Sequence, residues 1–115
     1  MRQPLCIVDG TRTPFCKAGT DLAEESAVDL GTHAFQHVLA KTGINPARID
    51  QVFIGCVGQP VDAANIARII ALRAGIPAHV PAMTVHRNCA SGLEALTQAH
   101  QASAAGQGEI FLIGA

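Results

Sequence analysis

The sequence MTVHRNCASGL at residues 83–93 passes from a strand-like segment, through a short polar turn, into small and apolar residues that suit the start of a helix. Cys89 stands at the junction. A strand that turns sharply into a helix presents one side chain at the end of the strand and directs backbone N–H groups toward it, as in a nucleophile elbow. The stretch therefore predicts a β-to-α connection with a thiol at its corner.

The sequence on both sides of this stretch repeats the alternation of strand and helix. Short apolar runs next to turn residues are expected as strands at 5–8, 51–57, 81–87 and 109–114. Segments with apolar residues at helical spacing are expected as helices at 26–42, 65–74 and 89–105. The order βαβαβαβ predicts a layered α/β fold, with a mostly parallel sheet, right-handed crossovers and helices on its faces.

Two local patterns sharpen the expected helices. Ser26 followed by Asp29 resembles a capping box at the start of the first helix. In the third helix, Leu93, Leu96 and Ala99 fall on one side, which we expect to face the core.

Length and composition narrow the class of protein. The chain of 115 residues is expected to form one domain over 1–115, and its 49% hydrophobic and 15% charged residues exclude a disordered tail. A net charge of -1 without basic clusters argues against nucleic acid as a partner. The sequence has no apolar run near the roughly 20 residues of a membrane span, and no signal-peptide pattern. We therefore expect a cytoplasmic protein.

The last strand-like run, residues 110–113, is followed at once by Ala115. A doubly wound domain would normally continue into another turn or crossover after such a strand. We therefore expect an incomplete domain, truncated after the fourth strand.

Cys89 is the candidate catalytic residue. The unpaired N–H groups and the positive end of the macrodipole at a helix N-terminus favour the thiolate, the reactive form of cysteine. The small residues Ala90, Ser91 and Gly92 would let a bulky thioester approach. The alternative is a small buried cysteine with a packing role only. The cysteines at 6, 16 and 56 form no C-x-x-C pair and are expected to be free thiols without a catalytic role.

The histidines and arginines offer weaker candidates. His33 and His37 are four residues apart on the first helix, but no third ligand completes a metal site, so we expect none. His86 is three residues before Cys89, and a general-base role there would require geometry that strand alternation does not ensure. The spacing of Arg68 and Arg73 argues against an anion-binding pair.

Residues 88–96, NCASGLEAL, resemble the acyl-enzyme signature of the thiolase family. Further matches are RTPF at 12–15 with Lys17, SAVDLG at 26–31, and NIAR at 65–68 followed by AGIP at 74–77. Together they cover essentially the whole chain in register. His86 stands where many members have Asn, and residues 17–19 lack the usual aromatic-glycine pair.

The resemblance implies a thiolase N-terminal domain, incomplete over 1–115, and an acyl-CoA C-acyltransferase activity. Cys89 would form the acyl-thioester intermediate in thiolysis of 3-ketoacyl-CoA or in condensation of acyl-CoA, in fatty acid metabolism. Coenzyme A and acyl-CoA would be substrates, with no permanently bound cofactor. The family's activating His and second Cys lie in its C-terminal half, so this chain by itself would not turn over. Its partner would be a further copy of the chain, in a homo-oligomer that is a dimer or a tetramer, or a missing C-terminal half.

Two other interpretations remain open. The chain could be a truncated, non-catalytic module that keeps the fold and assembles with related subunits through an open sheet edge. Ketoacyl synthases share the logic of a cysteine at an elbow, although their residues resemble 88–96 less closely.

Overall fold

The computed structural model describes residues 4–115 of the chain. The elements follow in the order α1 (Ala27–Thr42), η1 (Pro46–Arg48), β1 (Gln51–Gly55), α2 (Ile66–Arg73), β2 (Ala82–Val85), α3 (Ser91–Ala104) and β3 (Phe111–Gly114). Within residues 4–115, none of the helices combines the length and the apolar character that a membrane crossing requires.

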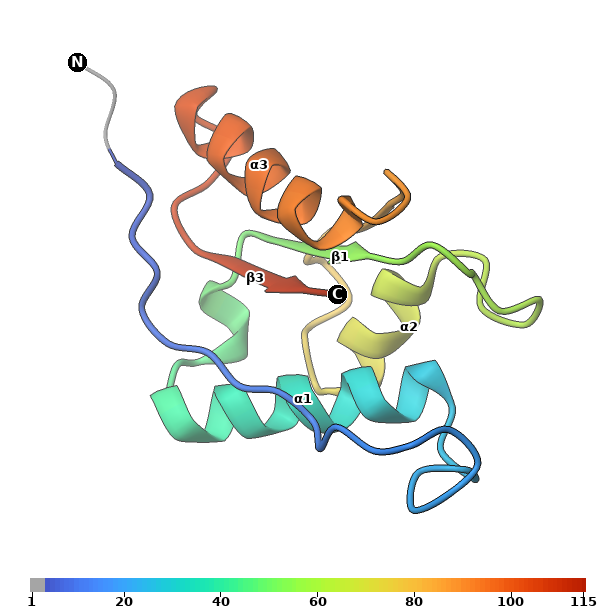
Figure 1. The fold of residues 1–115 in the computed structure, drawn as a ribbon. Helices are drawn as coiled ribbons and strands as arrows, with labels where there is room; N and C mark the ends of the chain where they lie inside the picture. Colours follow the sequence, from blue (N-terminus) through green and yellow to red (C-terminus); the bar gives the residue numbers. More distant parts are fainter. Residues whose placement is uncertain (1–3) are drawn as a thin grey trace.

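The three strands form one parallel sheet in the order β2-β1-β3. Helix α3 covers one face, and α1 and α2 lie on the other, so the domain has three layers (Figure 1). The predicted α/β fold with a parallel sheet and helices on its faces is confirmed. Because the strands are parallel, the carboxyl ends of β1 and β2 lie together, with Gly55 opposite Val85.

The central strand β1 is buried on both faces. Val52 and Ile54 belong to the apolar cluster under α1 and α2, whereas Phe53 belongs to the smaller cluster under α3. This alternation follows from the period of two along a strand. The continuous apolar run that predicted a strand covered on both sides is thereby explained.

The buried face of α3 matches the expected one only at Ala99. Its buried residues are Ser91, Ala95, Ala99 and Ala102, while Leu93 is 70% exposed. The physical reason is the close approach of α3 to the sheet, which admits only short side chains on the contacting face. The prediction that Leu93 faces the core was therefore wrong.

The segment at 5–8 is not a strand. No ladder joins it to another strand within residues 4–115. Leu5 packs against the cluster under α3, whereas Ile7 is 78% exposed and Val8 is 88% exposed. An apolar run becomes a strand only when a neighbouring backbone pairs with it, and here none does. Residues 4–115 form a sheet of three strands instead of the expected four.

Two acidic residues fasten the ends of elements. Ser26 and Asp29 form the predicted capping box at the start of α1. Asp50 precedes β1, and its carboxylate accepts hydrogen bonds from the N–H groups of Glu109 at 2.7 Å and Ile110 at 2.9 Å. These two bonds hold the pKa of Asp50 below its usual range. They also tie the segment before β3 to the start of β1.

Candidate active site

Cys89 lies in the turn between β2 and α3, at the carboxyl edge of the sheet. The residue before it, Asn88, has φ 47°, the left-handed conformation that few residues other than Gly adopt, although Asn does so more readily than most. The helix begins at Ser91 with Ala90 as its N-cap, so Cys89 precedes the helix instead of starting it. The expected helix start at 89 was two residues early.

The thiol of Cys89 is free and its residue is exposed. Within residues 4–115, the hydrogen bonds of the turn use the N–H groups of Arg87, Asn88, Ala90 and Ser91, and none uses that of Cys89. The arrangement therefore leaves both a thiol and a backbone donor of the same residue available to a ligand. It does not match a cysteine packed among apolar side chains.

The hydroxyl of Ser91 fastens the turn from inside. Its Oγ accepts a hydrogen bond from the N–H of Arg87 at 2.8 Å and donates one to the carbonyl of Asn88 at 2.7 Å. Ser91 is 4% exposed, so its side chain does not line the approach to the sulfur. Sequence reasoning treated Ser91 only as a small residue. The preference of Ser for bonding to nearby backbone at helix starts is the signal that could have identified this role.

An ion pair covers the outer side of the turn. The guanidinium of Arg87 donates to Glu94 at 2.6 Å, and Gln98 donates to the other oxygen of the same carboxylate at 2.8 Å. The hydrogen bond from Gln98, followed by that from Arg87, holds the pKa of Glu94 below its usual range. The ion pair thus joins the turn to the first turns of α3, with the Arg87 side chain mostly exposed.

Glycine at position 55 permits the contact between β1 and α3. A Cβ atom there would lie 2.4 Å from the carbonyl oxygen of Ser91 and 2.8 Å from the backbone nitrogen of Gly92. Both are backbone atoms, which cannot rotate away as a side chain would. Gly55 therefore sets how closely the Cys89 turn sits over the carboxyl end of β1.

His86 is placed beside the turn but does not bond to the sulfur. Its Nδ1 accepts a hydrogen bond from the N–H of Asn88 at 3.2 Å. Within residues 4–115, no hydrogen bond joins His86 to Cys89, so the structure gives no geometry for a general base at this position.

The other cysteines are free thiols that lie in different surroundings. Cys6 is exposed in the N-terminal segment, and Cys16 and Cys56 are half-buried. Cys56 also packs against the cluster under α1 and α2, which fits a packing role.

The remaining candidates are engaged elsewhere. His37 shares a hydrogen bond of 2.7 Å with the hydroxyl of Thr11, and with His33 it lines an open cavity beside residues 11–14. Arg68 donates to the carbonyls of Ala78 and Val80, both at 2.9 Å, so it supports the loop before β2. Among residues 4–115, His, Cys, Asp and Glu form no group of three or more that could hold a metal ion.

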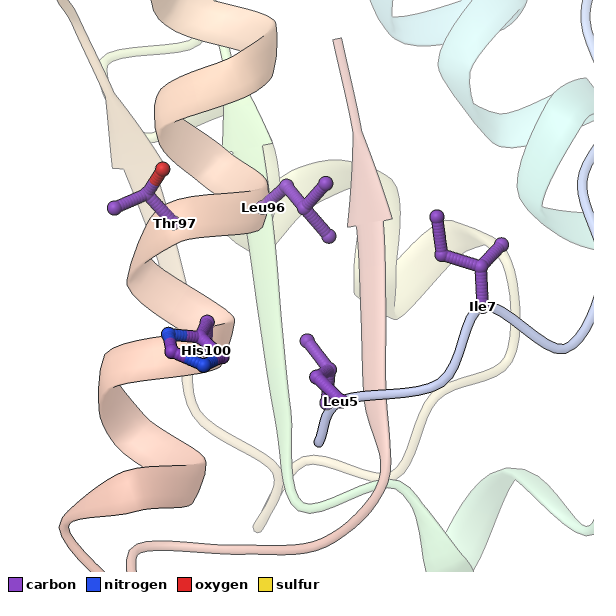
Figure 2. Close-up of a pocket in the computed structure, with 5 residues that line it drawn as sticks. All are labelled: Leu5, Ile7, Leu96, Thr97 and His100. Carbon is purple, nitrogen blue, oxygen red and sulfur yellow. The ribbon is translucent and has the colours of Figure 1, made fainter. Parts of the chain in front are cut away.

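A second cavity, of about 280 Å³, lies between the N-terminal segment and α3 (Figure 2). Leu5 and Ile7 line one side, and Leu96, Thr97 and His100 line the other. The lining is mostly apolar, and Cys89 is not part of it. The cavity therefore belongs to the packing of the N-terminal segment and not to the site around the thiol.

Comparison with known proteins gives matches over nearly the whole chain. The family described as "Thiolase, N-terminal domain" matches residues 5–115. A probable acetyl-CoA acyltransferase of Staphylococcus aureus is 41% identical over 103 residues, which are 90% of this chain and 26% of the relative. A 3-ketoacyl-CoA thiolase of Serratia proteamaculans is 42% identical over 110 residues, covering 96% of this chain and 25% of the relative.

A solved structure supports the same relationship. Human mitochondrial 3-ketoacyl-CoA thiolase, in complex with CoA, superimposes with a TM-score of 0.86 at 34% identity. The match covers 90% of this chain and 27% of the human chain. The chain thus spans about a quarter of the length of the curated relatives it matches.

Proposed function

This chain belongs to the thiolase family, and we propose that Cys89 is the nucleophile that carries the acyl group in its coenzyme-A-dependent acyl transfer. The supporting observation is an exposed thiol at the end of a strand, in a turn held by hydrogen bonds, directly before α3. Ligand sites in parallel α/β sheets lie at the carboxyl ends of the strands, which is where this turn sits.

The first half of the reaction requires only an attacking thiolate and a donor for the developing oxyanion. The Cys89 sulfur attacks the carbonyl carbon of an acyl-CoA thioester, and the carbonyl π electrons move onto oxygen. The N–H of Cys89, which has no partner within residues 4–115, is available to stabilise that oxygen. When the carbonyl re-forms, the C–S bond to coenzyme A breaks, and the coenzyme leaves as a thiolate that takes up a proton, which balances the proton that Cys89 released when it ionised.

Transfer of the acyl group completes the proposal. In thiolysis, Cys89 attacks the 3-keto carbonyl of a 3-ketoacyl-CoA, and the C–C bond breaks to release an acetyl-CoA enolate, which is protonated. The thiol of a second coenzyme A then accepts the acyl group. In condensation the same steps run in reverse. The His and second Cys of the family have no match in residues 1–115, so we assign to this chain only the acyl-carrying step.

The proposal extends to substrates and assembly. We propose acyl-CoA and coenzyme A as substrates, because the human structure to which this chain is similar is a complex with CoA. We also propose assembly with further protein, as a homo-oligomer or with a C-terminal half. The exposed side chains of Phe15, Val61 and Leu93 agree with such contacts.

The proposal is tested by covalent labelling. The chain is incubated with acetyl-CoA, and intact-protein mass spectrometry followed by peptide mapping locates any acetyl group. We expect a single acetyl group on Cys89, no label in the Cys89→Ala variant, and full label in Cys56→Ala and Cys6→Ala. Cys6 is the matched control because it is also an exposed free thiol. Equal labelling of Cys6 and Cys89 would remove the support for an activated thiol.

A second candidate function is a non-catalytic module that assembles with related subunits. The observation that favours it is the set of exposed apolar side chains at Phe15, Val61 and Leu93. This module requires no acyl transfer. Association of the chain in light scattering, combined with no acetyl label on Cys89, would favour the module over the enzyme.

A further inference from the structure

Ser91 has an unusual position for a polar residue. It is the one buried polar side chain in the part of the chain that the structure describes, at 4% exposure. A buried hydroxyl must have hydrogen-bond partners, and Ser91 uses its donor and one acceptor site on the backbone of the turn. Neither partner belongs to the regular ladder of a helix or a strand. The hydroxyl therefore acts on the turn itself.

The two hydrogen bonds bracket the strained residue. The N–H of Arg87 lies on one side of the Asn88 α-carbon and the carbonyl of Asn88 lies on the other, and both bond to the same Oγ. Asn88, with φ 47°, would relax toward an ordinary conformation if nothing held it. Such a relaxation would rotate the next peptide plane, which carries the N–H of Cys89. The Ser91 hydroxyl therefore restrains the orientation of Cys89, together with the Ser91 N–H, which donates to the same Asn88 carbonyl at 3.1 Å.

The Ser91 backbone is itself held in place. Its carbonyl oxygen and carbon would lie 2.4 Å and 2.5 Å from a Cβ on Gly55, so helix α3 rests directly on β1 at this residue. The hydroxyl thus connects the turn to the most rigid part of the domain, the buried central strand. A hydrogen bond from a fixed point positions its partner more precisely than one from a mobile side chain.

We propose that Ser91 is the positioning residue of the Cys89 site, which holds the thiol and the N–H of Cys89 toward the same reacting carbonyl. This inference rests on the proposed function of Cys89. Ser91 does not touch the substrate in this arrangement, because its hydroxyl is buried and fully engaged. It acts through Asn88.

The test measures the reactivity of the thiol without coenzyme A. The 115-residue chain is treated with iodoacetamide, and peptide mass spectrometry follows the alkylation rate of Cys89 relative to that of Cys6 in the same molecule. We expect this ratio to be well above one in the unaltered chain and to fall about tenfold in Ser91→Ala, the loss that corresponds to roughly 1.4 kcal/mol. Ser103→Ala, on the same helix, is expected to leave the ratio unchanged.

A pair of isosteric variants separates the hydroxyl from the packing. Thr and Val at position 91 have the same shape and differ in the hydroxyl alone. We expect Ser91→Thr to keep the ratio within about threefold of the unaltered chain and Ser91→Val to be as slow as Ser91→Ala. If Ser91→Ala fails to fold, this pair still tests the role of the hydroxyl. Any loss of stability from the added methyl group is common to Ser91→Thr and Ser91→Val. Hydrogen exchange at the Arg87 amide should be faster in Ser91→Val than in Ser91→Thr.

The outcomes distinguish the two proposals. A high Cys89 ratio that is equal in Ser91→Thr and Ser91→Val overturns the role of Ser91 and leaves the role of Cys89 intact. A Cys89 ratio near one in the unaltered chain overturns both, because there is then no activation for Ser91 to support.

Discussion

Replacing Gly55 with alanine should disturb the Cys89 turn without changing any residue in it. The new Cβ would lie 2.4 Å from the carbonyl oxygen of Ser91, and ordinary van der Waals contact begins at 3.4 Å. The contacting atoms are backbone, so the start of α3 must move away from β1 by about 1 Å. Overpacking of this kind typically costs about 1–3 kcal/mol of stability. A displacement of about 1 Å at a reacting group can cost up to about a hundredfold in rate.

Two measurements check this prediction. Urea unfolding gives the free energy of unfolding, and the rate of acetylation of Cys89 by acetyl-CoA reports on the turn. Gly58→Ala is the matched control, since Gly58 follows the same strand and a Cβ there would have nothing within 4 Å. We expect Gly58→Ala to change stability by less than about 0.5 kcal/mol and to leave the acetylation rate unchanged.

If Gly55→Ala unfolds at the same urea concentration as the unaltered chain and reacts at the same rate, the contact between β1 and α3 does not control the turn. A loss of stability with an unchanged rate would show that α3 shifts without carrying Cys89 along.

Other predictions concern the stability of the scaffold. Asp50→Ala should lose about 1 kcal/mol at neutral pH, a discounted value because the carboxylate is exposed and water competes for its hydrogen bonds. Because the folded-state pKa of Asp50 is lowered, its contribution to the free energy of unfolding is present above the ordinary Asp pKa and is lost as the pH falls through the folded-state pKa. The difference in stability between the unaltered chain and Asp50→Asn should therefore shrink in acid. A difference that does not change with pH would contradict this. Ile70→Ala should lower the free energy of unfolding, measured in urea, by about 2–5 kcal/mol, because Ile70 is fully buried between α1 and the sheet. Leu72→Ala, on the exposed side of α2, should lower it by less than about 1 kcal/mol.

Sequence reasoning recovered the elements whose signals are local. The capping box of Ser26 and Asp29 marks the start of α1 by adjacent hydrogen-bonding groups, and the run around Val52 marks a strand with two covered faces. The strand, turn and helix around Cys89 were predicted in the same way, because they are consecutive in the chain. These features depend on neighbours within a few residues, so their physics is contained in the sequence.

Sequence reasoning failed where a feature depends on a distant partner. Residues 5–8 have the composition of a strand, but pairing requires another backbone at the right distance. Leu93 is as apolar as a core residue, yet α3 buries its alanine face and leaves Leu93 exposed.

The sequence by itself determined the alternation of strands and helices, the parallel α/β class and the placement of a thiol at a β-to-α corner. Only the tertiary structure decided which face of α3 is buried, and that the Ser91 hydroxyl lies inside the turn with bonds to Arg87 and Asn88. The physical reason is range: helix and strand periodicity are encoded by nearby residues, whereas the fit between two elements depends on the gap between their backbones, which forms only when the chain folds.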